Sequence, residues 1–190
     1  MLFGKSNKEK FVIAPKNKTE YSLHMANIIL TGMSGAGKST IGVLAAKALG
    51  RNFIDTDILI QQQEHRLLQN IIDTDGIDTF LKIEENVVCG VHAEDCVIAT
   101  GGSVVYSDRA MKHLAESGTV VYLYIPFEEL AKRLKSITTR GIVMRQGSTL
   151  KDVYSERLPL YEKYSGVKID CSCMSVEQCV ELVVKEAERK

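Results

Sequence analysis

The sequence lacks the features that mark several classes of protein. None of its uncharged apolar runs, such as residues 120–125, approaches the ~20 residues that a membrane span needs. Net charge is also absent, because 24 Lys and Arg balance 24 Asp and Glu, which argues against nucleic acid or anionic membrane as a partner bound through bulk charge. With 45% apolar and 25% charged residues, a disordered or collagen-like chain is excluded. We expect one globular domain with its own core.

Evidence for disulfides or secretion is lacking as well. The five cysteines are odd in number and scattered, at positions 89, 96, 171, 173 and 179. Residues 1–25 contain no apolar stretch of the kind found in signal peptides. We therefore expect reduced thiols, a cytoplasmic location and a monomer.

Residues 1–25 differ from the rest of the chain. They hold five lysines against two glutamates and show no sustained hydrophobic periodicity. We interpret them as a basic N-terminal extension, either native or added by cloning. Residues 26–190 then form the domain.

From residue 27 onward, short apolar strands alternate with helical patterns. Strands are predicted at residues 28–31, 53–54, 97–100, 120–125 and 167–170, and helices at residues 38–49, 57–70, 77–93, 108–117, 150–163 and 175–188, with a further helix opened by Pro126. Residues 137–150 are aperiodic. This alternation predicts an α/β fold whose parallel sheet is covered by helices on both faces. A ligand is expected beyond the carboxyl ends of the strands.

Residues 32–39, GMSGAGKS, fit the phosphate-binding pattern G-x-x-x-x-G-K-[ST]. The motif follows a predicted strand and opens a predicted helix, which is the required context. Its glycines allow backbone N–H groups to surround phosphates, Lys38 can reach the β- and γ-phosphates, and Ser39 can ligate Mg²⁺. The motif indicates a nucleotide without choosing between kinase, GTPase and ATPase.

Other polar residues follow the later strands. Asp55 and Asp57 end the second strand; one is suited to the Mg²⁺ shell and the other to a substrate hydroxyl, although a helix N-cap is the alternative for Asp57. Paired glycines at 101–102 indicate either close approach of a ligand or a tight turn. Four arginines follow the fourth strand: Arg133, Arg140, Arg145 and Arg157. They could serve phosphoryl transfer or bind a carboxylate, or they could simply lie on a solvated face.

In this order, the motifs resemble the shikimate kinase family. The matching segments are GMSGAGKST, DTD, F-x-x-x-E at residues 80–84, TGG, TTRG and SERLPLYEKYS, and they run from about residue 27 to 170. The resemblance implies a nucleoside-monophosphate-kinase-like P-loop fold. Its five parallel strands would lie in the order 2-3-1-4-5, with a mobile lid over ATP.

The resemblance also implies roles for single residues. The ATP phosphates would be bound by Gly32, Gly35, Gly37, Lys38, Ser39 and Thr40, and adenine would stack on Arg133. Mg²⁺ would be held by Ser39 and Asp55. The acceptor would contact Asp57, Gly101, Gly102 and Arg157, with Asp57 activating its hydroxyl and Arg157 binding its carboxylate. The catalytic residues would be Lys38, Asp57 and the lid residue Arg140.

Three positions depart from the family pattern, and two of them lie in segments that would bind the acceptor. The family pattern F-R-x-x-E has Leu81 in place of its arginine, which is a second clamp on the shikimate carboxylate. The pattern T-G-G-G has Ser103 in place of its last glycine, and the loop at residues 171–174 lacks the usual arginine or proline.

The chain is thus predicted to be an ATP-dependent kinase of a small carboxylated acceptor, with shikimate as the best match. One alternative is a sibling kinase, of the gluconate type or another, that phosphorylates a different hydroxylated metabolite. A second alternative is a nucleotide-binding regulatory module without catalysis. Retention of Asp55, Asp57 and Arg140 argues against that module.

Overall fold

The computed structural model describes residues 26–135 and 142–189. At its centre lies a five-stranded parallel sheet, formed by β1 (Asn27–Thr31), β2 (Asn52–Asp55), β3 (Cys96–Ala99), β4 (Gly118–Tyr124) and β5 (Val167–Asp170). The strand order is β2-β3-β1-β4-β5, which confirms the order 2-3-1-4-5. Every residue of β1 is buried, as expected for a central strand covered on both faces.

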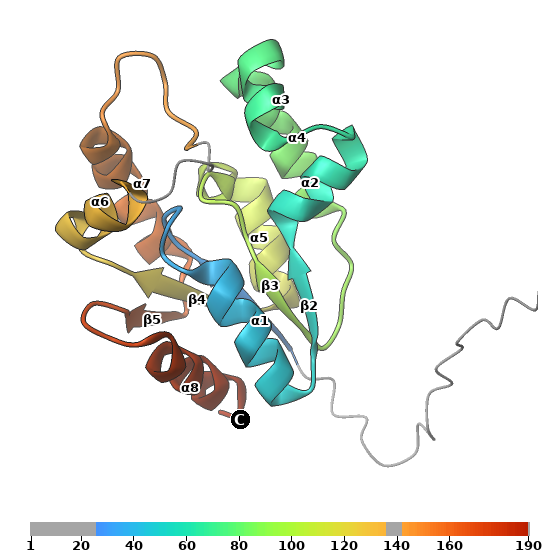
Figure 1. Ribbon diagram of the computed structural model, residues 1–190. Coiled ribbons are helices and arrows are strands. Elements are labelled where there is room, and N and C mark those ends of the chain that lie inside the picture. Colours follow the sequence, from blue (N-terminus) through green and yellow to red (C-terminus); the bar gives the residue numbers. More distant parts are fainter. Residues whose placement is uncertain (1–25, 136–141, 190) are drawn as a thin grey trace, which may run out of the picture.

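Helices connect the strands and cover both faces of the sheet (Figure 1). They are α1 (Lys38–Leu49), α2 (Thr56–Glu64), α3 (Leu68–Asp75), α4 (Ile77–Cys89), α5 (Asp108–Ser117), α6 (Phe127–Lys135), α7 (Leu150–Tyr164) and α8 (Val176–Ala187), with a short 3₁₀ helix at Val104–Tyr106. Each parallel pair of strands needs such a crossover.

Two apolar cores follow from the alternation of side chains along the strands. On β1, Ile28 and Leu30 face a core shared with α1 and α8, whereas Ile29 faces a core shared with α4 and α5. A third cluster under α2, α3 and α4 includes Ile60, Ile71 and Phe80. The sheet is thereby fixed between two layers, and the loops at its carboxyl edge are left to form a site.

One predicted helix is wrong. The pattern at residues 57–70 was expected to form a single helix, but the chain forms α2 and α3, separated at residues 65–67. His65 adopts a left-handed conformation with φ of 52°, which ends α2. No glycine or proline marks this break. The helix predicted at residues 77–93 also ends earlier, at Cys89.

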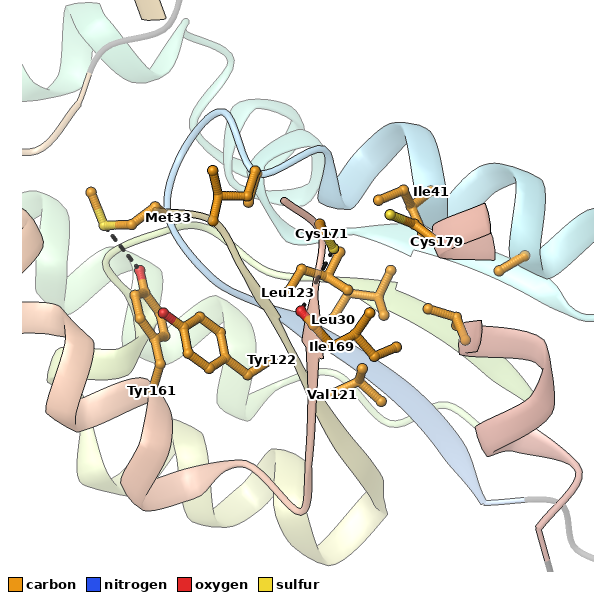
Figure 2. Close-up of a cluster of buried hydrophobic side chains, with 14 of the residues drawn as sticks. Leu30, Met33, Ile41, Val121, Tyr122, Leu123, Tyr161, Ile169, Cys171 and Cys179 are labelled. Atoms are coloured by element: carbon orange, nitrogen blue, oxygen red, sulfur yellow. Dashed lines mark hydrogen bonds between the residues drawn. The ribbon is translucent and has the colours of Figure 1, made fainter. Parts of the chain in front are cut away.

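The core reaches the functional edge through two stacked tyrosines. The rings of Tyr122 on β4 and Tyr161 on α7 lie 5.0 Å apart, nearly parallel, and Figure 2 shows the Tyr161 hydroxyl directed at the Met33 sulfur. The same hydroxyl donates to the Gly102 carbonyl oxygen at 2.6 Å. Tyr161 therefore ties the turn after β3 to the core. In the described part of the chain, no helix combines the length and the apolarity needed to cross a bilayer.

Candidate active site

The loop between β1 and α1 has the backbone of a phosphate-binding loop. Its glycines Gly32, Gly35 and Gly37 have φ of 139°, 90° and 92°, which residues with a β-carbon rarely adopt. No side chain caps the start of α1, and no acidic residue lies in its first turn. The first N–H groups of the helix are therefore available to an anion, and the helix dipole favours one there.

Lys38 is folded back over this loop. The side chain is buried, and its Nζ donates to the carbonyl oxygens of Gly32 at 2.7 Å and Met33 at 3.0 Å. The ammonium group is thus held beside the N–H groups of the loop, where a nucleotide phosphate would meet both. Thr40, in the first turn of α1, is exposed.

Ser39 and Asp55 bring hard oxygen atoms to the loop. The Ser39 hydroxyl donates to Oδ2 of Asp55 at 2.7 Å, and Oδ1 of Asp55 accepts from the backbone N–H of Asp57 at 3.0 Å. Asp55, not Asp57, is therefore the N-cap of α2. Hydroxyl and carboxylate oxygens beside a phosphate site suit Mg²⁺, so these residues fit the predicted metal ligands.

Asp57 lines a cavity next to the P-loop. This cavity is lined by residues from the P-loop, α2, α3, α4, the turn after β3, the segment before α7, and α7 itself: Ser34, Asp57, Leu68, Ile72, Phe80, Glu84, Gly102, Ser103, Val143 and Arg157. The predicted acceptor residues Asp57, Gly102 and Arg157 are thus brought together.

Gly101 and Gly102 are required because side chains approach them closely. A β-carbon on Gly101 would lie less than 3.0 Å from Oε1 of Glu84 and Oδ1 of Asp57. A β-carbon on Gly102 would lie 2.9 Å from Oγ of Ser34 and 3.3 Å from Nη1 of Arg157. The glycines are thus needed for close packing against side chains of the site, and contact of this pair with a ligand stays a prediction.

Arg157 is almost completely buried, with an exposed fraction of 1%. Its Nη2 donates to the Val143 carbonyl oxygen at 2.7 Å, and its guanidinium group lies 4.9 Å from the centre of the Tyr106 ring. Its Nε has no hydrogen-bond partner among the described residues. A fixed, dehydrated guanidinium group at a cavity is suited to bind a carboxylate.

Glu84 is a site residue that the sequence prediction did not assign. It lies one turn after Phe80 on the buried face of α4, with an exposed fraction of 2%. Burial is the main cause that raises the pKa of Glu84 to about 8; the Asp57 charge adds to this, and hydrogen bonding by Ser103 opposes it. A signal was present, because Glu84 interrupts the apolar stripe of Phe80, Val87 and Val88.

Comparison with known proteins decides the family. The family model described as shikimate kinase matches residues 34–188. A shikimate kinase from Thermodesulfovibrio yellowstonii is 34% identical over 168 residues, which cover 87% of this chain and 96% of that protein. The chain belongs to the shikimate kinase family.

Structural comparison agrees with this assignment. A shikimate kinase from Acinetobacter baumannii, solved in complex with shikimate, superposes with a TM-score of 0.77 at 28% identity, covering 85% of this chain and 92% of that one. A gluconokinase from Sinorhizobium meliloti, at 20% identity and a TM-score of 0.52 over 86% and 92% of the two chains, shares the fold alone.

Two of the three family departures lie in or next to the acceptor cavity. Ser103 lines it directly, and the Ser103 side chain hydrogen-bonds the Glu84 carboxyl. Leu81 borders neighbouring hollows together with Tyr106 and, in one of them, Arg145. Arg145 pairs at 3.5 Å with Asp78 on the exposed surface.

Two predicted nucleotide residues remain apart from these contacts. Arg133 on α6 pairs with Glu129 one turn earlier, and its charge acts on the Cys171 thiol beyond β5. It therefore lies near the loop expected to border adenine. Arg140 and the predicted lid fall at residues 136–141, outside the described residues, as do residues 1–25.

Proposed function

We propose that this protein transfers the γ-phosphoryl group of ATP to a hydroxyl of shikimate, forming shikimate 3-phosphate and ADP. The strongest support is the position of Asp57, which lines one cavity with the P-loop residue Ser34 and the buried Arg157. Family membership supports the same reaction, since relatives that match most of the chain are shikimate kinases.

In this proposal each half of the site has its own task. The P-loop N–H groups and Lys38 bind the phosphates, while Ser39 and Asp55 hold Mg²⁺, which would neutralise phosphate charge when bound. Arg157 binds the acceptor carboxylate and thereby orients the ring that carries the hydroxyl groups. Gly101 and Gly102 let the acceptor lie against the backbone, and Arg140 is the proposed lid arginine on the transferred group.

Asp57 completes the transfer chemically. Its carboxylate accepts the proton of the acceptor hydroxyl as that oxygen forms a bond to the γ-phosphorus. The bond from the γ-phosphorus to the β–γ bridging oxygen breaks, and ADP carries the electron pair away.

A second candidate is a kinase of a different small hydroxylated metabolite, favoured by Ser103 in the acceptor cavity and Leu81 in the neighbouring hollows. The test is ADP release from Mg-ATP with shikimate, gluconate and a panel of small hydroxy acids. Saturable turnover on shikimate with a KM below about 1 mM supports the first proposal. Turnover on another acceptor alone would select the second, and ATP binding without any turnover would favour a regulatory module.

We also propose a cytoplasmic monomer that has neither nucleic acid nor membrane as a partner. All five cysteines lie in the described residues and are free thiols, which is typical of a reducing compartment. Sedimentation equilibrium of the purified protein tests the monomer: a mass near 21.1 kDa is expected.

A further inference from the structure

The acceptor cavity contains a buried acid whose hydrogen bonding is incomplete. Glu84 is 2% exposed, and its Oε1 has no hydrogen-bond partner among the described residues. Ser103, with an exposed fraction of 3%, lines the same cavity, and hydrogen bonding by its side chain opposes the raised pKa of Glu84. A hydroxyl provides a hydrogen bond but no positive charge, so it offsets little of the cost of burying a carboxylate.

A second carboxylate lies close to this acid. Oε1 of Glu84 and Oδ1 of Asp57 are each less than 3.0 Å from the same point beside Gly101, and they are therefore less than about 6 Å apart. At that distance, in a buried site, ionisation of one carboxyl opposes ionisation of the other. A proton on Glu84 relieves the repulsion.

The charges around Glu84 come from three helices. Asp57 on α2 disfavours its ionised form, whereas Lys38 on α1 and Arg157 on α7 favour it. Tyr161, also on α7, is a neutral phenol whose pKa is raised mainly by burial. Leu81, one turn before Glu84 on α4, adds no cation. Burial is the largest influence on the pKa of Glu84.

We propose that Glu84 and its neighbour Ser103 are specificity-determining residues for the acceptor: Glu84 is an uncharged acid beside Asp57, so that Arg157 alone holds the acceptor carboxylate, and Ser103 lines the same cavity without adding a compensating charge. This inference rests on the proposed function. An ionised Glu84 would place a second negative charge in the cavity and repel a carboxylated acceptor. Protonation removes that charge. In relatives with the family's arginine at the position of Leu81, a cation would offset it instead.

The proposal predicts a pH dependence of acceptor binding. Because the pKa of Glu84 is raised to about 8, we expect the KM for shikimate to rise at least threefold between pH 7 and pH 9.5, and by no more than about tenfold per pH unit. ADP is quantified by chromatography at saturating Mg-ATP. The shikimate KM of Glu84→Gln, whose side chain is always neutral, should change less than twofold between pH 7 and pH 9.5.

Further variants separate the two residues. Ser103→Ala removes a hydrogen bond that lowers the pKa of Glu84, so the rise in KM should move to higher pH. Leu81→Arg adds a cation that keeps Glu84 ionised and paired, so the rise should disappear. The exposed residues Glu116 on α5 and Ser155 on α7 provide the controls: Glu116→Gln and Ser155→Ala should keep the wild-type profile.

Thermal unfolding adds a readout that needs no substrate. With a folded-state pKa above the unfolded value of 4.5, native Glu84 keeps a proton that the unfolded chain has lost, and stability falls as pH rises from about 4.5 to 8. The Tm of Glu84→Gln relative to wild type should therefore be at least about 3 °C higher at pH 9 than at pH 5.

The outcomes distinguish the two levels of the proposal. Absence of saturable turnover on shikimate by the wild-type protein would refute the proposed function, while the Tm comparison would still test the protonation of Glu84. Turnover with a pH-independent wild-type KM, or a Tm difference that does not change with pH, would refute the assignment of Ser103 and Glu84 and leave the kinase activity in place.

Discussion

A single methyl group at Gly101 tests whether the acceptor cavity is built as described. The β-carbon of Gly101→Ala would lie less than 3.0 Å from the carboxyl oxygens of Glu84 and Asp57, whereas carbon–oxygen pairs normally lie about 3.5 Å apart. The φ of Gly101 is not in the positive range that only glycine favours. The expected damage is therefore steric and falls on the two carboxyl groups.

The magnitude follows from the packing of these groups. Overpacking of a filled interior costs about 1–3 kcal/mol, and 1 kcal/mol corresponds to about 2–4 °C in a domain of this size. We expect the Tm of Gly101→Ala to fall by about 2–12 °C. Since both carboxyl groups must move toward the acceptor, a loss of about 2 kcal/mol in acceptor binding should raise its KM about 30-fold. The KM for ATP should change less than threefold.

The assay compares Gly101→Ala with Gly90→Ala. Gly90, at the end of α4, has φ of −85°, and its added β-carbon would lie 3.4 Å from the carbonyl oxygens of Asn86 and Val87. This control should keep wild-type KM values and lose little stability. Wild-type shikimate KM and Tm in Gly101→Ala would refute the close approach of Glu84 and Asp57 to this turn.

Three further substitutions test the proposed roles one at a time. Lys38→Ala should lower kcat at least 100-fold, because the transferred phosphoryl group loses a neighbouring positive charge. Lys47→Ala, on the exposed face of the same helix, should leave kcat unchanged. Asp57→Asn should lower kcat by about 10²–10⁴-fold with an ATP Kd, measured by calorimetry, within threefold of wild type; retained turnover would remove Asp57 from the chemistry. Arg157→Met should raise the acceptor KM by about 30-fold to several thousand-fold. The control Arg109→Met, at an exposed position, should leave the acceptor KM unchanged.

The fold could be predicted because parallel sheets leave a simple trace in the sequence. Buried strands are centred on continuous apolar runs, such as residues 28–30 in β1, and the helices between them carry apolar residues at helical spacing. The break between α2 and α3 could not be predicted in this way. It depends on His65 in a left-handed conformation, which is a property of local packing and not of hydrophobic period.

The two halves of the site differed in how much the sequence revealed. The phosphate half is one contiguous motif, so its spacing alone implied the loop, Lys38 and Ser39. The acceptor half is assembled from several segments that lie far apart in the sequence. Asp57, the glycines at 101–102 and Arg157 were candidates from their positions after the strands, but only the family resemblance gave them specific acceptor roles. Ser34 was missed as an acceptor-side residue because the motif treats it as a variable position, although its Oγ lies close to Gly102.

Charged residues on apolar helix stripes are the signal that would have exposed this half directly. Glu84 lies among the buried residues of α4, and Arg157 lies among those of α7 between Tyr154 and Tyr161. A buried charge on a helix is unfavourable unless another group compensates it. Here both side chains line one cavity, each with one polar atom that has no hydrogen-bond partner among the described residues. Two such interruptions on different helices of one sequence therefore predict a shared polar site, and an acceptor with a hydroxyl and a carboxylate supplies the partners that both atoms need.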